Sequence, residues 1–255
     1  MAFEIVTIPC LQDNYAFLLH STNTGETAVI DVPEAAPISA ALAERGWTLT
    51  EVWLTHHHWD HIDGLPDLAE ASDATVTGAV ADAERLPPLH RSVSDGDSFA
   101  FAGHSVGVVD VSGHTVGHIA FYVPAADAVF TGDSLMAMGC GRLFEGTPHQ
   151  MWDSLSKLAA LPGDTMVCSG HEYTQANAKF AVTVDTDNPL LNARVAQINA
   201  DRAAGKPTVP SLLSDELATN PFLRAVDPGV KAHLGMAGAS DADAFAEIRR
   251  RKDSF

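Results

Sequence analysis

The sequence predicts an α/β fold over its first two thirds, followed by a smaller helical domain. As far as about residue 172, short runs rich in β-branched and aromatic residues alternate with turn residues and a few helical segments. Beyond that point the apolar spacing is helical, and we expect no further strand. The predicted domains are therefore residues 1–172 and residues 173–255.

The expected strands are short and are bounded by turn residues such as Asp, Asn and Gly. In chain order they are Phe3–Ile8, Tyr15–Leu19, Thr27–Asp31, Val52–Leu54, Ser105–Val111, His118–Val123, Ala128–Thr131 and Thr165–Cys168. Two helices are expected among them. The first is Ala35–Arg45, which stops at Gly46, and the second runs from Pro148 to about Leu161, with Thr147 as its N-cap.

The C-terminal part is expected to be helical. The predicted helices are Glu172–Val184, a helix from Pro189 to about Ala204, Leu212–Leu217 and Asp241–Arg251. Ser240 and Asp243 have the spacing of a capping box at the start of the last of these.

Composition narrows the class of protein. The chain has 255 residues, of which 46% are hydrophobic, enough for one large core or for one core with a small appendage. A net charge of −18 disfavours nucleic acid and anionic membranes as partners. We also expect no membrane span and no signal peptide. Three scattered cysteines outside any CxxC spacing are typical of free buried thiols and favour the cytoplasm.

Four histidines and one aspartate lie within the six residues from His56 to His61, directly after the expected strand Val52–Leu54. Imidazole nitrogen suits zinc and iron, and a carboxylate oxygen is a harder companion ligand. His56 and His58 are two residues apart and can point to one side, while Asp60 and His61 lie beyond the turn. One segment can thus supply two ligands to each of two metal ions. The alternative is a histidine-rich surface loop.

Three further candidate ligands follow other expected strands. They are His114, Asp133 and His171, each preceded by a glycine that permits a tight turn. Because residues at the carboxyl ends of strands gather along one edge of an open α/β sheet, we expect these side chains to meet the first group.

This pattern resembles that of the metallo-β-lactamase superfamily. The resemblance implies an αββα sandwich with a small C-terminal helical domain. It also implies two metal positions with Asp133 bridging them, the first held by His56, His58 and His114 and the second by Asp60, His61 and His171. Each metal would keep an open position, which is typical of a catalytic site. His57 is expected to point away from the metals, and His118 to form a structural hydrogen bond near them.

Four more segments are similar to glyoxalase II, the hydroxyacylglutathione hydrolase of that superfamily. They are Ile8–Tyr15, Gly139–Thr147, Gly170–Thr174 and Arg249–Asp253. The resemblance covers essentially the whole chain. It implies hydrolysis of S-D-lactoylglutathione to glutathione and D-lactate, the second step of methylglyoxal detoxification. A metal-activated bridging hydroxide would attack the thioester, and Asp60 and Asp133 would orient it and accept its proton.

The resemblance also places Arg142, Phe144, Tyr173, Arg249 and Lys252 at the substrate. Glutathione carries carboxylates, and a compact cationic patch would bind them against the repulsive background of an acidic chain. Arg249 and Lys252 are three residues apart on an expected helix and so share a face. A solvated basic helix end and a packing tyrosine are the alternatives. Arg142 replaces the usual lysine, and Phe144 replaces a frequent tyrosine and cannot donate a hydrogen bond.

We expect two divalent metal ions, with zinc favoured and iron or manganese as alternatives. The expected partner is a small-molecule glutathione thioester. We expect the chain to be a monomer. Competing interpretations are a hydrolase of lactones or other thioesters on the same fold, a persulfide dioxygenase with a single iron, and a non-enzymatic metal-binding module. The complete second ligand set of Asp60, His61 and His171 argues against the single-iron enzyme.

Overall fold

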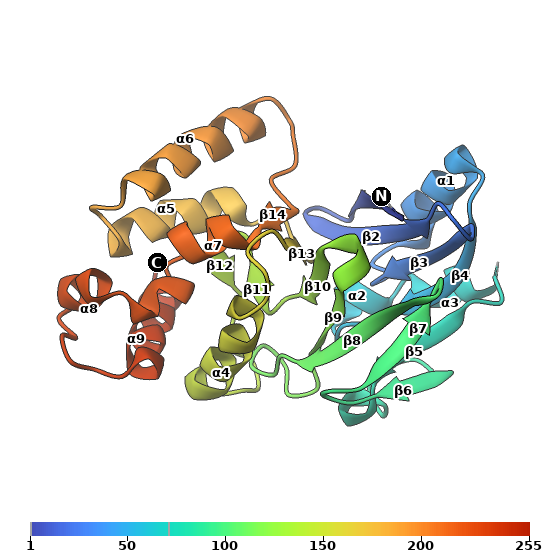
Figure 1. Cartoon of the computed structure of the whole chain (residues 1–255), viewed down its shortest axis with the longest axis horizontal. Helices are drawn as coiled ribbons and strands as arrows, with labels where there is room; N and C mark the ends of the chain where they lie inside the picture. The colour runs from blue at the N-terminus through green and yellow to red at the C-terminus, as the bar shows by residue number, and fades with distance from the viewer. Residues whose placement is uncertain (1, 71) are drawn as a thin grey trace. The chain divides into compact units, whose positions relative to one another are not determined.

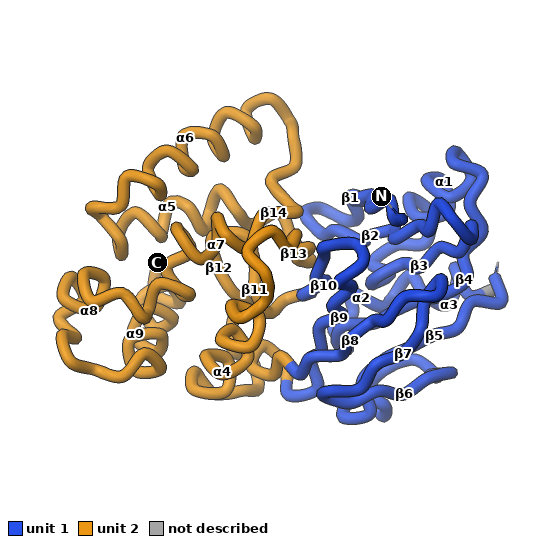
Figure 2. The backbone as a smooth tube through the Cα atoms, in the orientation of Figure 1, with its two compact units in different colours: residues 1–110, 116–132 blue, residues 111–115, 133–255 orange. Residues whose placement is uncertain are grey.

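The computed structural model describes residues 2–70 and 72–255, and the chain divides into two compact units (Figures 1 and 2). Unit 1 comprises residues 1–110 and 116–132, and unit 2 comprises residues 111–115 and 133–255. This division groups residues that lie close together in space. The boundary expected after residue 172 instead separates a strand-rich stretch of sequence from a helical one. That boundary stays a prediction.

The first sheet of unit 1 has six strands arranged in chain order. They are β1 (Phe3–Cys10), β2 (Asn14–Ser21), β3 (Glu26–Ile30), β4 (Thr48–Trp53), β5 (Thr75–Ala79) and β6 (Arg91–Val93). The first three pair antiparallel, and β3 to β6 pair in parallel. Because β3 and β4 are parallel neighbours, the residues that follow them lie at one edge of the sheet. There Asp31 Oδ1 accepts a 2.8 Å hydrogen bond from the backbone N–H of Thr55.

Helix α1 (Ala35–Arg45) has the predicted bounds and packs Ile38 and Leu42 into the core beside this sheet. It ends at Gly46, whose φ of +66° is the left-handed conformation that commonly closes a helix. Two shorter helices, α2 (Trp59–Ile62) and α3 (Leu65–Glu70), follow β4 in the chain.

The remaining strands of unit 1 pair antiparallel and face the first sheet through an aromatic cluster. They are β7 (Ser98–Phe101), β8 (His104–Asp110), β9 (Ile119–Val123) and β10 (Ala128–Gly132). Trp53 on β4 is fully buried, and its ring lies 5.3–6.5 Å from the rings of Phe99, Phe101, Phe121 and Phe130. One side chain of the first sheet therefore contacts three strands of the second group.

Unit 2 is mostly helical. Its strands are β11 (Leu135–Met136), β12 (Gly139–Cys140), β13 (Met166–Ser169) and β14 (Ser211–Leu212). Its α-helices are α4 (Pro148–Ala159), α5 (Thr174–Val184), α6 (Pro189–Ala203), α7 (Leu213–Thr219), α8 (Pro228–Leu234) and α9 (Asp241–Asp253). Figure 1 shows α5 and α6 side by side, and they share a core with Met138. Within the described residues, no helix combines the length and apolar character needed to span a bilayer.

The β11–β12 hairpin is held by buried polar side chains of the helical segment. Asn177 and Asn220 donate to carbonyl oxygens of the hairpin, and Glu216 accepts the backbone N–H of Met138 at 2.8 Å. Since an unsatisfied buried polar group costs free energy, these bonds define the path of the hairpin. Through this contact the C-terminal helices position the loop that follows β12.

The expectation of no strand beyond residue 172 is wrong. β14 pairs antiparallel with β13, with Met166 opposite Leu212. A strand of two residues has no periodicity to detect, so its pairing is decided by tertiary structure. The strands β5 to β7 and helix α8 were likewise not among the predicted elements, and α5 begins at Thr174 instead of Glu172.

We expect Trp53→Ala to lower the free energy of unfolding by about 3–5 kcal/mol, because it leaves a cavity where the two groups of strands meet and removes the 2.6 Å hydrogen bond from the indole to Glu51. Urea titration followed by circular dichroism measures the change. Trp59→Ala is the matched control, because that indole is 64% exposed. A loss below about 1 kcal/mol for Trp53→Ala would contradict this account of the core.

Candidate metal centre

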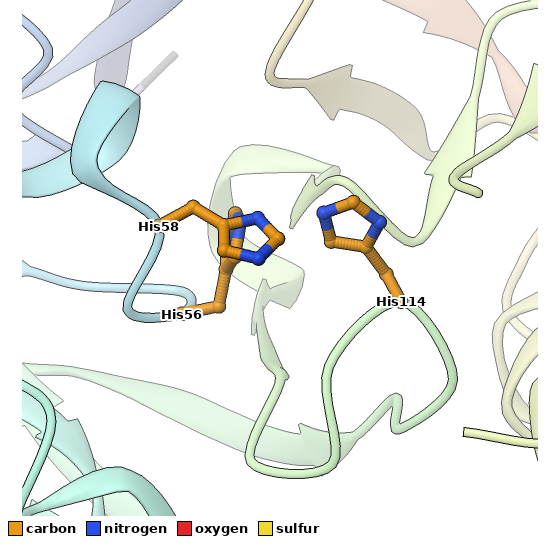
Figure 3. Close-up of side chains that lie close together, drawn as sticks. All are labelled: His56, His58 and His114. Atoms are coloured by element: carbon orange, nitrogen blue, oxygen red, sulfur yellow. The ribbon is translucent and has the colours of Figure 1, made fainter. Parts of the chain in front are cut away.

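Four of the predicted ligands lie in unit 1, on α2 and on the segment that joins it to β4. Nε2 of His56 lies 3.1 Å from Nδ1 of His58, and the two rings meet edge to face. Figure 3 shows both side chains on this segment. Asp60 Oδ2 lies 4.0 Å from His61 Nε2. The structure thus brings together the two ligands that this segment was expected to give to each metal.

Asp31, which the sequence reasoning did not single out, orients His61. Its Oδ2 lies 2.8 Å from Nδ1 of His61 and accepts the hydroxyl of Thr55 at 2.8 Å. The ligand atoms of Asp31, His56 and His61 lie within 4.8 Å of one another, so this group could itself hold an ion. A carboxylate on Nδ1, however, keeps the proton there and leaves Nε2 as a metal ligand, and this is the role that the geometry favours.

Two other side chains shape the ligand segment. Asn14 donates its amide to the backbone oxygen of Asp60 at 2.9 Å and to Oδ2 of the same residue at 3.1 Å. His57 turns to Asp82, with 2.9 Å between Nδ1 and Oδ2, as expected from the alternation of side chains along an extended segment. Asn14 and Asp82 are far from the motif in sequence, which is why spacing alone did not reveal them.

His118 packs against His56, and Gly132 lies close to the neighbouring Thr55. The His118 ring stacks on that of His56 at 4.5 Å, and its Nδ1 lies 3.2 Å from the carbonyl oxygen of Ile119, in line with the structural role expected for it. Gly132 has a φ of +48°, and a Cβ there would lie 2.4 Å from Oγ1 of Thr55. Only glycine fits this position.

The other three predicted ligands lie together in unit 2. Asp133 Oδ2 is 3.4 Å from Nε2 of His114 and 3.3 Å from Nε2 of His171, and all three residues are buried. Nδ1 of His114 lies 2.7 Å from the carbonyl oxygen of Arg142, so that nitrogen carries the proton. His114 is drawn in Figure 3 on the turn that follows β8.

These distances fit metal ions. Ligand atoms bound at 2.0–2.1 Å to a tetrahedral ion lie about 3.4 Å apart. In a neutral His114 with its proton on Nδ1, a nitrogen lone pair faces a carboxylate oxygen, and two acceptors at such a distance repel unless a cation lies between them. The donor set of imidazoles and carboxylates is also the one that zinc, iron and manganese accept.

The predicted substrate residues differ in their exposure and in their neighbours. Phe144 is exposed, and its ring lies 5.2 Å from that of His114. Tyr173 is partly exposed and stacks on His171 at 4.6 Å. Arg142 follows β12, and 62% of its side chain is exposed. An aromatic side chain thus accompanies each of two predicted ligands, and the Arg142 guanidinium is accessible.

Arg249 and Lys252 lie on α9 in different surroundings. Arg249 is only 5% exposed, and its Nη1 donates to the backbone oxygen of Cys140 at 3.2 Å. The ammonium of Lys252 lies 5.3 Å from the centre of the Phe180 ring. The pKa of Lys252 is lowered, mainly because the ammonium is partly buried and secondly because the positive charge of Arg249 is near. Arg249 therefore has a structural contact in addition to any role at the substrate.

The three cysteines are buried thiols, as expected from their spacing. Burial raises the pKa of Cys10 and of Cys140 to about 11, and it raises the pKa of Cys168 as well. These thiols stay protonated at neutral pH, and none has the properties of a nucleophile.

Two family models together match residues 12–255. Residues 12–171 match the metallo-beta-lactamase superfamily, and residues 172–255 match the hydroxyacylglutathione hydrolase C-terminus. The crystal structure of ETHE1 from Myxococcus xanthus is similar, with a TM-score of 0.68 and 27% identity over 98% of this chain and 90% of that one. The chain is thus a metallo-β-lactamase-fold protein, and the predicted αββα fold class with a C-terminal helical region is confirmed.

Two curated relatives are similar over their whole length. The hydroxyacylglutathione hydrolases of Ruegeria pomeroyi and Roseobacter denitrificans are 66% and 67% identical, over 100% of both chains in each pair. The chain belongs to the hydroxyacylglutathione hydrolase (glyoxalase II) family. This membership confirms the family and the class of reaction expected from the sequence, a metal-dependent hydrolysis of hydroxyacylglutathione thioesters.

We expect Asp31→Asn to weaken metal binding by about 10- to 100-fold, because the amide cannot hold the Nδ1 proton of His61 as a carboxylate does. Competition with a chromophoric chelator measures the affinity of the metal-depleted protein. Asp73→Asn, at an exposed position, is the matched control. Equal affinity of Asp31→Asn and the wild type would rule out the orienting role.

Proposed function

We propose that the chain hydrolyses S-D-lactoylglutathione to glutathione and D-lactate at a centre with two metal ions. The first ion would be held by His56, His58 and His114 and the second by Asp60, His61 and His171, and Asp133 would contribute to both. The observation that carries this proposal is the single oxygen of Asp133 within 3.4 Å of two imidazole nitrogens. Further support comes from unit 1, where His56 Nε2 lies 3.1 Å from His58 Nδ1 and Asp60 Oδ2 lies 4.0 Å from His61 Nε2.

We propose zinc as the metal, because five of the seven ligands are imidazoles. The two carboxylates also suit iron and manganese, so availability contributes to the outcome. When bound, two such ions supply the ionisation of a water molecule at neutral pH and the polarisation of the thioester carbonyl. Elemental analysis of the purified protein identifies them.

The side chains of this centre can perform the remaining steps. Asp60 and Asp133 present carboxylate oxygens that orient the attacking water and accept its proton. The leaving group is a thiolate, whose conjugate acid has a pKa of about 8.5. Because such a group departs readily, the reaction needs no dedicated general acid. A site composed largely of metal ligands is therefore sufficient.

The glutathione part of the substrate is proposed to lie against residues of the helical domain, 173–255, and the loop after β12. Arg142, Arg249 and Lys252 supply positive charge for its carboxylates. The Tyr173 hydroxyl can donate a hydrogen bond to the peptide part, whereas the Phe144 ring can only pack against it. Residues 1–172 form the catalytic domain in this proposal.

We also propose that the chain works in the cytoplasm as a monomer. Its three buried thiols are typical of a reducing compartment. Light scattering coupled to size-exclusion chromatography measures the mass, and a mass of about twice that of one chain would contradict the monomer.

Asp133→Asn is expected to lower turnover of S-D-lactoylglutathione by at least 100-fold, because an amide is a much weaker bridging ligand than a carboxylate. The loss of thioester absorbance measures the rate, and elemental analysis of the same sample measures the metal. Asp153→Asn, on the exposed face of α4, should retain wild-type turnover.

Parallel assays separate the competing functions. An acyl-homoserine lactone and a β-lactam should be hydrolysed far more slowly than the thioester by the wild type. Faster hydrolysis of either compound, or full turnover by Asp133→Asn with its metal bound, would contradict the proposal.

Arg142→Ala is expected to raise KM for S-D-lactoylglutathione by about tenfold and to affect kcat less, because it removes an accessible cation that is proposed to bind the glutathione part of the substrate. Steady-state kinetics measure both constants. Arg250→Ala is the matched control, since that arginine is exposed and pairs with Glu247. An unchanged KM would remove Arg142 from the substrate site.

A further inference from the structure

The carboxylate of Asp253 lies within the cationic cluster of unit 2, which consists of Arg142, Arg249 and Lys252. Asp253 Oδ1 lies 2.7 Å from Nη2 and 3.0 Å from Nε of Arg249. The same oxygen lies 3.9 Å from Nε of Arg142. One carboxylate oxygen thus bridges two guanidinium groups that come from different elements, the loop after β12 and helix α9.

The contacts of Arg249 leave little room for a second anion. Its Nε and Nη2 donate to Asp253, its Nη1 donates to the backbone oxygen of Cys140, and its side chain is only 6% exposed. The Asp253 side chain is 40% exposed, so its carboxylate can be reached from solvent and can move away. An incoming carboxylate can pair with Arg249 only where Asp253 now lies.

We propose that Asp253 is a specificity-determining residue which, in the free protein, occupies the position of a substrate carboxylate. This inference rests on the proposed function, because it takes a glutathione thioester as the ligand of the cationic cluster. Asp253 competes with the substrate for the two arginines and so limits affinity for glutathione and its thioesters. The same competition favours release of the glutathione product.

The charges set the expected size of the effect. Three cations and one carboxylate give the cluster a charge of +2 within a chain of −18. Neutralising Asp253 raises the cluster to +3 and removes a like charge a few ångströms from the bound carboxylate. In a well-solvated setting such a change alters binding by about three- to tenfold, and less at high salt.

The test is Asp253→Asn, in which the amide oxygen still accepts hydrogen bonds from Arg249 and preserves the packing of α9. We expect KM for S-D-lactoylglutathione and Kd for glutathione each to fall by about three- to tenfold, measured by steady-state kinetics and calorimetry on the metal-loaded protein. Asp241→Asn is the matched control, because it removes the same charge about 18 Å away along α9. Should Asp253→Asn fail to fold, Asp253→Ser carries the same expectation.

Glutathione diethyl ester, whose carboxylates are masked, separates competition from a general gain in affinity. Its Kd should be equal for the wild type and Asp253→Asn. An unchanged or higher Kd for glutathione in the variant overturns the inference, as does an equal gain with the diester or with Asp241→Asn. A wild type that neither hydrolyses the thioester nor binds glutathione overturns the proposed function and the inference with it, whereas the other results overturn the inference alone.

Discussion

The proposed chemistry depends on one oxygen of Asp133, which lies within 3.4 Å of Nε2 of both His114 and His171. Because Nδ1 of His114 carries the proton, its Nε2 is an acceptor, and an acceptor nitrogen so near a carboxylate oxygen is stable around a cation and costly without one. The surrounding backbone enforces this approach, since a Cβ on Gly141 would lie 1.9 Å from the carbonyl oxygen of Asp133. The centre is therefore preorganised by close packing of the chain.

Carboxylates and carbonyl groups around the ligands decide which imidazole nitrogen faces the metals. Asp31 holds Nδ1 of His61, and the backbone oxygen of Arg142 holds Nδ1 of His114. In both cases Nε2 is left as the ligand atom. The second contact has a further consequence, because Arg142 is also a proposed substrate residue. One short loop therefore orients a predicted ligand and, in the proposed function, would also bind glutathione.

The helical segment does more than present cations. Asn177, Glu216 and Asn220 fix the β11–β12 hairpin, and Arg249 binds the backbone of Cys140 at its end. Helix α9 thus contacts the end of β12, directly before the loop that carries Arg142. Within unit 2, the groups that would recognise the substrate and the groups that support a metal ligand belong to one hydrogen-bonded region.

The sequence by itself determined the family, the ligand types and most helices, because each of these depends on a short-range pattern. Examples are the spacing from His56 to His61, the cap at Thr147 and the stop at Gly46. Only the tertiary structure decided what depends on contacts between distant segments. It paired the two-residue strand β14 with β13, placed Asp31 behind His61, and buried Arg249 against Cys140 and Asp253. Such contacts have no local period or motif, since each partner is selected by packing and by the need to satisfy buried polar groups.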